Sequence, residues 1–253
     1  MPPSHDTPPD GISAAEWQAR IELAAAYRLV ARRGWDDLIY THVSARHPER
    51  DDAFLINPFG LRFAEVTASN LLVIDEAGKL LSDSPHRANP SGFAIHAAVH
   101  RAREDAHCVM HLHTDAGMAV SMLQCGLLPL SQHAMRFWKN IGYHDYEGIA
   151  LSPAEAGRLV EHLGPHPALI LRNHGTLTCG RTVAEAFVLM DTLEKACRTQ
   201  LTAMAASPQL NLPPEEVLDH TLAQLTGDWE PEGELEWPAL LRMLDREEPD
   251  YRN

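Results

Sequence analysis

The chain has 253 residues, of which 45% are hydrophobic, and it carries a formal net charge of −14. This length and composition suit a globular protein with one large domain. An acidic protein lacks the basic surface needed for sequence-independent binding to nucleic acid or to an anionic membrane, so we expect neither partner. No apolar run is long enough to predict a membrane-spanning helix. The four cysteines are widely spaced and form no CxxC pair, which is typical of a protein of the reducing cytoplasm.

The predicted elements begin after residues 1–12, a Pro-rich polar lead that we expect to be disordered and that lacks the apolar segment of a signal peptide. Helical spacing predicts helices over residues 13–34, 89–103 and 115–123 and a long helix over residues 182–206. Apolar runs bounded by turn residues predict strands over residues 52–60, 70–81 and 106–114 and a strand pair over residues 167–180. This irregular mixture indicates one α/β or α+β domain over residues 13–206. We expect residues 207–253 to form a C-terminal arm.

Two histidines, His111 and His113, stand two residues apart near the end of the strand predicted over residues 106–114. Residues i and i+2 of a strand point to one face, so both imidazoles can approach one point. Imidazole suits zinc, manganese, iron and cobalt, and a catalytic metal site usually combines three protein ligands with an open position. His174 is a third candidate, because Gly175 after it allows the chain to bend tightly at the end of an apolar strand. In a chain with 15 histidines, the His111–His113 pair alone is also compatible with chance.

Three segments make the chain recognisable by their order and spacing: FLINPFGLRFAEVTASNLLVID, then HLHT, then NHGTL. With them the chain resembles the class II aldolase/adducin family over residues 15–206, and its first segment is closest to the adducin-like branch. The resemblance implies a three-layer α/β/α sandwich with a central, largely antiparallel sheet. It also implies a homotetramer whose active sites lie at subunit interfaces, where a neighbouring subunit supplies C-terminal residues.

The same resemblance assigns the matching histidines to a catalytic divalent ion. It implies that His111, His113 and His174 hold one metal ion per subunit, the same three residues that the spacing had indicated. Zinc is the usual ion in the family, with manganese, cobalt or iron as alternatives.

The acid/base residue of the sugar-phosphate aldolases is missing from this chain. In those enzymes a Glu follows a Ser-Ser pair, four residues before a His, whereas alignment on His96 puts Gly92 at that position. Glycine cannot move a proton, so another group must do so. His133 falls where the aldolases have a Tyr that reaches in from a neighbouring subunit, and His42 falls near the phosphate region. Because imidazole titrates near neutrality, we expect His133 and His42 to be the catalytic acid/base residues, with His133 also a candidate fourth ligand.

The positions that hold the substrate phosphate in those aldolases also differ. Thr41, Phe59 and Pro90 stand where a backbone nest needs Gly-like freedom and small hydroxylated residues. A non-phosphorylated substrate is therefore expected. Arg136 follows His133 by one helical turn and can bind a carboxylate with two hydrogen bonds, while the tail can reach a neighbour's site. The residues expected to bind substrate are Ser91, Asn57, Gly60, Arg136 and Tyr251.

These features predict a metal-dependent carbon–carbon lyase. Three neutral imidazoles leave a divalent ion its positive charge, which can stabilise the enolate formed when a carbon–carbon bond breaks. Decarboxylation needs no base to start, so the glycine at position 92 favours a decarboxylase or a retro-aldolase that acts on an oxo- or hydroxy-carboxylic acid. The alternatives are a non-haem iron oxygenase on the same fold and a non-catalytic, adducin-like assembly module. A complete set of three histidines argues against the assembly module.

Overall fold

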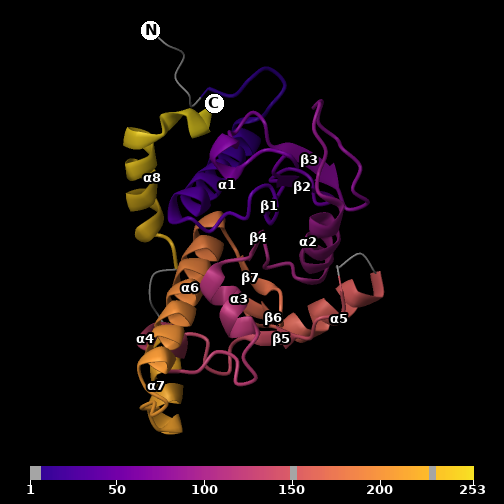
Figure 1. Cartoon of the computed structure of the whole chain (residues 1–253). Coiled ribbons are helices and arrows are strands. Elements are labelled where there is room, and N and C mark those ends of the chain that lie inside the picture. Colours follow the sequence, from indigo (N-terminus) through magenta and orange to yellow (C-terminus); the bar gives the residue numbers. More distant parts are fainter. Residues whose placement is uncertain (1–6, 149–152, 228–231) are drawn as a thin grey trace.

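The computed structural model describes residues 7–148, 153–227 and 232–253, without the side chains of Pro90, Ser91, Phe93 and Pro153. Its described part contains one seven-stranded sheet in the order β3-β2-β1-β4-β7-β6-β5 (Figure 1). All neighbouring strands are antiparallel except β5 and β6, which confirms the expected, largely antiparallel sheet. The strands are β1 His42–Arg46, β2 Ala53–Ile56, β3 Leu72–Asp75, β4 Cys108–Leu112, β5 Gly142–His144, β6 Ala168–Leu171 and β7 Gly175–Gly180.

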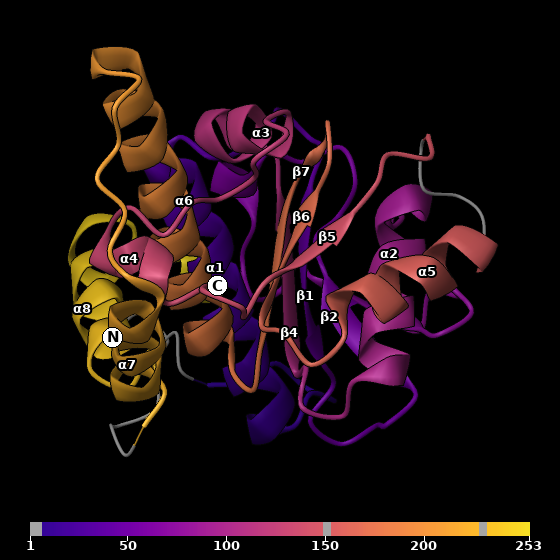
Figure 2. The same ribbon diagram turned by 90° about the horizontal axis from the view of Figure 1, so that it is seen from below.

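Helices cover both faces of this sheet, so the fold is the predicted three-layer sandwich. Figure 2 shows the sheet edge-on, with α2 and α5 on one side and α1, α3 and α6 on the other. The helices of the described residues are α1 Ala14–Arg33, α2 Pro90–Ala102, α3 Asp115–Ser121, α4 Gln132–Met135, α5 Pro153–Leu163, α6 Val183–Ala206, α7 Glu215–Leu225 and α8 Glu236–Glu247, with the 3-10 turns η1 Phe63–Glu65 and η2 Pro249–Arg252. None of them is long and apolar enough to cross a membrane.

The first helix begins and ends at the residues that its sequence predicts. Ser13 accepts a hydrogen bond from the backbone N–H of Glu16, and Gly34 closes the helix in the left-handed conformation. Its buried side chains pack on β1 and on α6. This helix therefore forms the main core with one face of the sheet.

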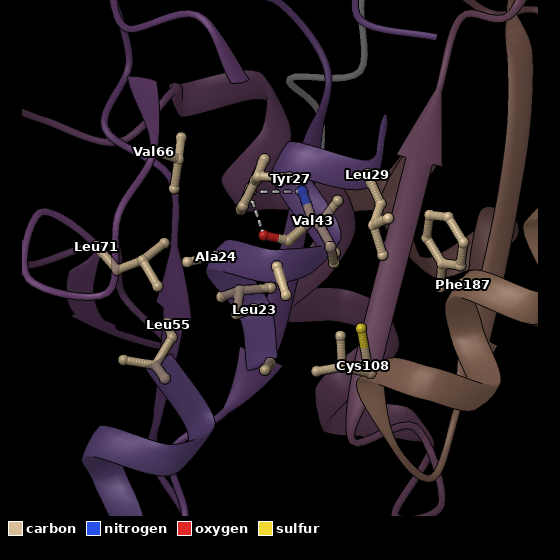
Figure 3. Close-up of a cluster of buried hydrophobic side chains, with 14 of the residues drawn as sticks. Leu23, Ala24, Tyr27, Leu29, Val43, Leu55, Val66, Leu71, Cys108 and Phe187 are labelled. Atoms are coloured by element: carbon tan, nitrogen blue, oxygen red, sulfur yellow. Dashed lines mark hydrogen bonds between the residues drawn. The ribbon is translucent and has the colours of Figure 1, made fainter. Parts of the chain in front are cut away.

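One polar side chain organises that core (Figure 3). The hydroxyl of Tyr27, a fully buried residue, donates to the carbonyl of Val43 and contacts Oδ1 of Asn57 at 2.8 Å. The same oxygen accepts from the backbone N–H groups of Val43 at 2.8 Å and Asn57 at 3.2 Å. Tyr27 thus joins α1 to β1 and to the segment that follows β2.

The end of the chain packs against α1. Trp237, Leu244 and Tyr251 belong to the same hydrophobic cluster as α1 and β1. The guanidinium of Arg28 pairs with Asp250 at 2.7 Å, and the backbone N–H of Ala68 donates to the carbonyl of Tyr251 at 2.9 Å. The last part of the predicted C-terminal arm therefore shares the core of its own chain.

Candidate metal and active site

A cavity of about 330 Å³ opens beside the ends of β1 and β4, and this volume suits a small organic substrate. Its described lining contains neither a carboxylate nor a Lys or Arg side chain. The lining residues are Tyr40, Thr41, His42, Phe59, Asn89, Ile95, His111, His113, Tyr146, Gly148 and His174.

The structure brings the three predicted metal ligands together. Ligand atoms of His111, His113 and His174 all lie within 4.8 Å of one another. His111 lies in β4, His113 follows the end of that strand, and His174 lies in the turn between β6 and β7. A Cβ on Gly175 would lie 2.5 Å from the carbonyl oxygen of Leu112, so only glycine lets the two segments approach so closely.

Hydrogen bonds orient two of these imidazoles. Nδ1 of His111 donates to the carbonyl of Thr176 at 3.0 Å, and Nδ1 of His113 donates to Oδ2 of Asp37 at 2.9 Å. Because carbonyl and carboxylate oxygens accept, Nδ1 carries a hydrogen in both rings, and Nε2 is the nitrogen that each ring can offer to a metal ion. The two Nε2 atoms face each other at 3.1 Å.

This donor set fits a divalent ion. When neither Nε2 carries a hydrogen, the two lone pairs repel at this distance, and a cation between them removes that repulsion. Tetrahedral zinc with Zn–N distances of about 2.0–2.1 Å would separate its ligand nitrogens by about 3.3 Å. Burial also lowers the pKa of His174 to about 4 and that of His111 well below its usual value, so both rings are neutral near pH 7, as metal ligands must be.

His42 occupies the space that the missing acid/base residue would need. A Cβ built on Gly92 would collide with Cδ2 and Nε2 of the His42 ring. His42 is buried, pairs with His111 across β1 and β4, and has its ring centroid 5.3 Å from that of His111. Burial lowers its pKa to about 3, so the ring is neutral near pH 7. The side chain at position 92 and the imidazole of His42 are thus mutually exclusive.

The rest of the cavity wall is largely apolar and aromatic. Tyr40 and Phe59 have ring centroids 6.4 Å apart, and Tyr146 lies 6.4 Å from the ring of His174. Thr41 has a positive φ of 64°, and its buried hydroxyl finds no hydrogen-bond partner within the described parts of the chain. Asp37 is a site residue that sequence reasoning missed, since no motif marks it, whereas Thr41 was noted only as a departure from the phosphate-binding pattern.

Two predicted residues, one on α4 and one directly after it, are absent from the cavity lining. His133 is exposed on this short helix, which contacts α6 and α7. Arg136 follows it and pairs with Glu232 at 2.6 Å, and it donates to the carbonyl of Leu225 at 3.2 Å. A role for His133 or Arg136 in catalysis therefore depends on a neighbouring subunit and stays a prediction.

The other predicted substrate contacts are also dispersed. Asn57 is buried against Tyr27, and Gly60 is exposed in the turn that follows it. Tyr251 is fully buried in its own chain, where its hydroxyl donates to Asp245 at 2.8 Å. The side chain of Ser91 falls outside the described part of the structure. Of the predicted acid/base and substrate-binding residues, His42 is the one that the structure places beside the metal ligands.

A three-layer α/β fold with three imidazoles clustered at the ends of its strands defines the class of α/β proteins that carry a candidate metal site. The sequence matches the family described as "Class II Aldolase and Adducin N-terminal domain" over residues 21–201. The chain therefore belongs to the class II aldolase and adducin family, whose aldolases use a divalent metal, typically zinc.

Its relatives include both kinds of protein that the family name contains. A putative aldolase class 2 protein of Pseudomonas aeruginosa is 49% identical over 255 residues, which cover 98% of each chain. Alpha-adducin of Mus musculus is 39% identical over 241 residues, which cover 89% of this chain but 33% of the adducin. The solved structure of L-fuculose 1-phosphate aldolase from Glaciozyma antarctica superposes with a TM-score of 0.85 at 29% identity and covers 98% of each chain.

Proposed function

We propose that this chain is a divalent-metal-dependent carbon–carbon lyase, a decarboxylase or retro-aldolase, that acts on a non-phosphorylated oxo- or hydroxy-carboxylic acid. One observation carries the proposal: the imidazole of His42 fills the space of a side chain at position 92, beside three histidines that fit a metal. This position of the ring supports His42 as the acid/base group of the site, supplied by a strand rather than by a helix.

The protonation state of each histidine indicates the role that we propose for it. His111, His113 and His174 would hold the ion, zinc first, which when bound supplies positive charge that stabilises negative charge developing on the substrate. In a retro-aldol cleavage His42, kept neutral by burial, would accept the proton of the substrate hydroxyl at Nε2 and return it to the enolate carbon. In a decarboxylation it would instead pass a proton from solvent to the carbon that loses CO₂. The unpartnered hydroxyl of Thr41 would bind a polar atom of the substrate.

The cavity wall supports a substrate without a phosphate group. Phosphate sites rely on backbone nests, small hydroxylated residues or Arg and Lys side chains. Here Tyr40, Phe59 and Tyr146 take much of the wall, and its described lining offers no Lys or Arg. We therefore propose an acid with an apolar or aromatic body rather than the sugar phosphate named for the Glaciozyma antarctica enzyme.

We also propose that the protein works as a homotetramer in which His133 reaches the cavity of a neighbouring subunit, while Arg136 stays paired with Glu232 of its own chain. The exposure of His133 on α4 supports this placement. Equilibrium sedimentation gives the assembly state. A monomer that has full lyase activity would overturn this part of the proposal.

The test is a substrate screen with the metal-loaded protein. Oxo acids, hydroxy acids and hydroxyaromatic acids are incubated with it, and release of CO₂, pyruvate or an aldehyde is measured. We expect release that a chelator abolishes, that His42→Ala lowers and that the exposed control His107→Ala leaves unchanged. An absence of all three products would contradict the lyase assignment. Oxygen uptake with iron would then indicate the oxygenase, and a protein that binds no metal ion and turns over none of these acids would indicate the adducin-like assembly role.

A further inference from the structure

A chain of buried polar side chains leads away from His42 between β1 and α2. Nδ1 of His42 lies 2.8 Å from Nε2 of His96, and Nδ1 of His96 lies 2.6 Å from Oγ of Ser44. The same Oγ lies 2.7 Å from Nε2 of His100, and Nδ1 of His100 lies 2.8 Å from the carbonyl oxygen of Ala106. None of these four side chains is more than 4% exposed.

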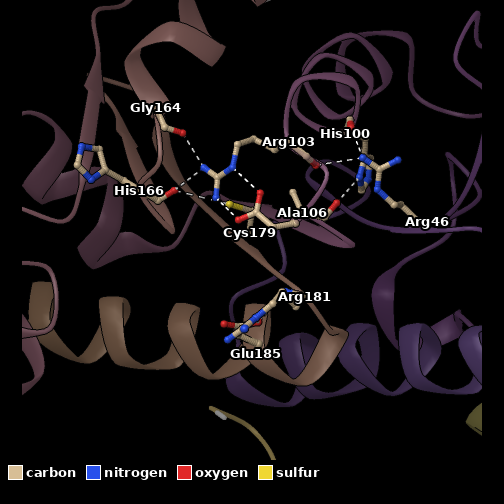
Figure 4. Close-up of polar contacts among 10 residues, drawn as sticks. Arg46, His100, Arg103, Ala106, Gly164, His166, Cys179, Arg181 and Glu185 are labelled. Carbon is tan, nitrogen blue, oxygen red and sulfur yellow. Dashed lines mark hydrogen bonds and ion pairs between the residues drawn. The ribbon is translucent and has the colours of Figure 1, made fainter. Parts of the chain in front are cut away.

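The carbonyl at the far end gives this chain a direction. A carbonyl oxygen only accepts, so Nδ1 of His100 must donate to Ala106. Burial, together with the nearby Arg46 guanidinium, keeps His100 neutral, and its Nε2 is therefore an acceptor. Arg46 donates to the carbonyls of His100 and Arg103, which fixes the end of α2 next to this imidazole (Figure 4).

The direction then passes through the hydroxyl to His42. Ser44 has one hydrogen, which it donates to His100, so it can only accept from Nδ1 of His96. Burial keeps His96 neutral, so Nε2 of His96 accepts from Nδ1 of His42. His42 is left with a bare lone pair on Nε2, for which the described residues offer no hydrogen-bond donor.

We propose that Ser44, His96 and His100 are positioning residues, which transmit the polarity of the Ala106 carbonyl to His42 and hold its Nε2 unprotonated beside the metal ligands. The array is a fixed dipole chain and not a proton path, because the carbonyl at its end has no proton to release or to exchange. Its importance for catalysis rests on the proposed function of His42. Its hydrogen-bond directions do not depend on that function.

The tautomers of the three imidazoles test this proposal. In full-length protein labelled with ¹⁵N at histidine, long-range ¹H–¹⁵N correlations identify the protonated ring nitrogen, in metal-free and in zinc-loaded samples alike. We expect Nδ1–H with a bare Nε2 for His42, His96 and His100. A protonated Nε2 on His42 in the wild-type protein would overturn the proposal, whether or not the protein proves to be a lyase.

Removal of the Ser44 hydroxyl separates His100 from His96 and His42. Ser44→Ala removes the hydroxyl that joins His100 to His96 by hydrogen bonds, so His100 keeps Nδ1–H on Ala106 while His96 and His42 lose their fixed tautomers. Thr178→Val is the matched control, since it also removes one buried hydroxyl. The Thr178 hydroxyl lies outside the histidine array and donates to the carbonyl of Ala186 at 2.9 Å. We expect this control to leave all three tautomers unchanged. Unaltered His42 and His96 tautomers in a folded Ser44→Ala protein would contradict the proposal that Ser44 fixes the tautomers of these two rings.

The same variant distinguishes this proposal from the proposed function. If lyase activity exists, Ser44→Ala should lower kcat at least tenfold with KM and metal content close to wild type, because the ligands and the cavity wall stay in place. Ser44→Thr retains a hydroxyl and should restore the tautomers and kcat wherever the added methyl is accommodated. Wild-type tautomers as expected, without any lyase activity, would refute the proposed function alone.

Discussion

Strands β1 and β4 present two faces of opposite character. On the face toward α1 they bury Val43, Ala45, Met110 and Leu112 in the main hydrophobic core, where Tyr27 is a fully hydrogen-bonded polar residue. On the face toward α2 the alternate positions of the same strands carry His42, Ser44 and His111. Because strand side chains alternate, two short strands can hold the fold together on one side and build a site on the other.

The buried polar groups on the two faces of β1 and β4 differ in where their hydrogen bonds end. On the α1 face, Tyr27 closes its hydrogen bonds on backbone groups, so removal of its hydroxyl should affect stability alone. On the α2 face the hydrogen bonds run in one direction and end at His42, beside the cavity. Changes on this face should therefore affect chemistry more than stability, and the following predictions test this difference from the largest expected effect to the smallest.

Loss of the His42 ring should reduce catalysis more than it reduces stability. General acid–base groups contribute about 10²–10⁴-fold, so His42→Ala should lower kcat of the proposed lyase by this order. Metal content should stay close to wild type, since His42 is not one of the three ligands. Steady-state kinetics combined with elemental analysis checks both values, and near-normal kcat in a metal-loaded variant would remove His42 from the mechanism.

A side chain at position 92 should conflict with His42. Overpacking a buried site typically costs about 1–3 kcal/mol, so we expect Gly92→Ala to lower the free energy of unfolding by up to about 3 kcal/mol. In the double variant Gly92→Ala with His42→Gly the collision is absent, so the penalty of the alanine should largely disappear. Urea unfolding of the wild type, the two single variants and the double variant gives the coupling energy between positions 42 and 92. Additive penalties would show that the two residues do not compete for this space.

On the opposite face, Tyr27→Phe should act on stability alone. Loss of the hydroxyl leaves buried backbone and amide groups of Val43 and Asn57 without a partner, so we expect a loss of about 2 kcal/mol in the free energy of unfolding. Metal content and kcat per folded molecule should match wild type. A tenfold fall in kcat for this variant would break the distinction between the two faces.

The buried histidines should make the α2 face sensitive to acid. Burial lowers the pKa of His100 from 6.5 to about 3, so its neutral form stabilises the fold above pH 6.5. As the pH falls below 6.5, His100 takes up a proton in the unfolded chain but stays neutral in the folded chain. The unfolded state is therefore favoured, and this stability is lost. We expect His100→Gln to reduce the pH dependence of the free energy of unfolding by about 1.4 kcal/mol per pH unit between pH 6 and pH 4.

The control for this measurement is the exposed His220 on α7, whose replacement by Gln should leave the slope at its wild-type value. The other buried histidines are the same in all three proteins, so their contributions cancel in the comparison. Equal slopes for His100→Gln and wild type would mean that His100 is not kept neutral in the folded state.

Local patterns predicted much of the fold and the metal ligands. The spacing of His111 and His113, with His174 before a Gly, indicated three ligands that the structure brings together. The first helix and its Ser13 cap also follow from nearest neighbours in the sequence. Helix α5 and the edge strand β5 were not predicted, because β5 is a three-residue parallel strand without an alternating pattern of its own.

The arrangement around the ligands depends on contacts that are distant in the sequence. Gly92 could be identified as the position that lacks an acid/base residue, but its replacement by His42 depends on how closely α2 approaches β1. Asp37 orients His113 from 76 residues away, and no motif marks it. His133 was selected by alignment with a subunit interface, which one chain cannot form, and Arg136 was selected because it follows His133 by one helical turn. Such relations follow from tertiary packing, and a linear pattern does not contain them.

Metal content tests the central claim most directly. Protein purified without a histidine tag should contain close to one divalent ion per chain by elemental analysis, and His174→Ala should lose most of it, whereas His107→Ala should not. Zinc, manganese or cobalt would agree with the proposed lyase, and iron with oxygen uptake would favour the oxygenase. Metal well below one per chain, unchanged by His174→Ala, would contradict the account.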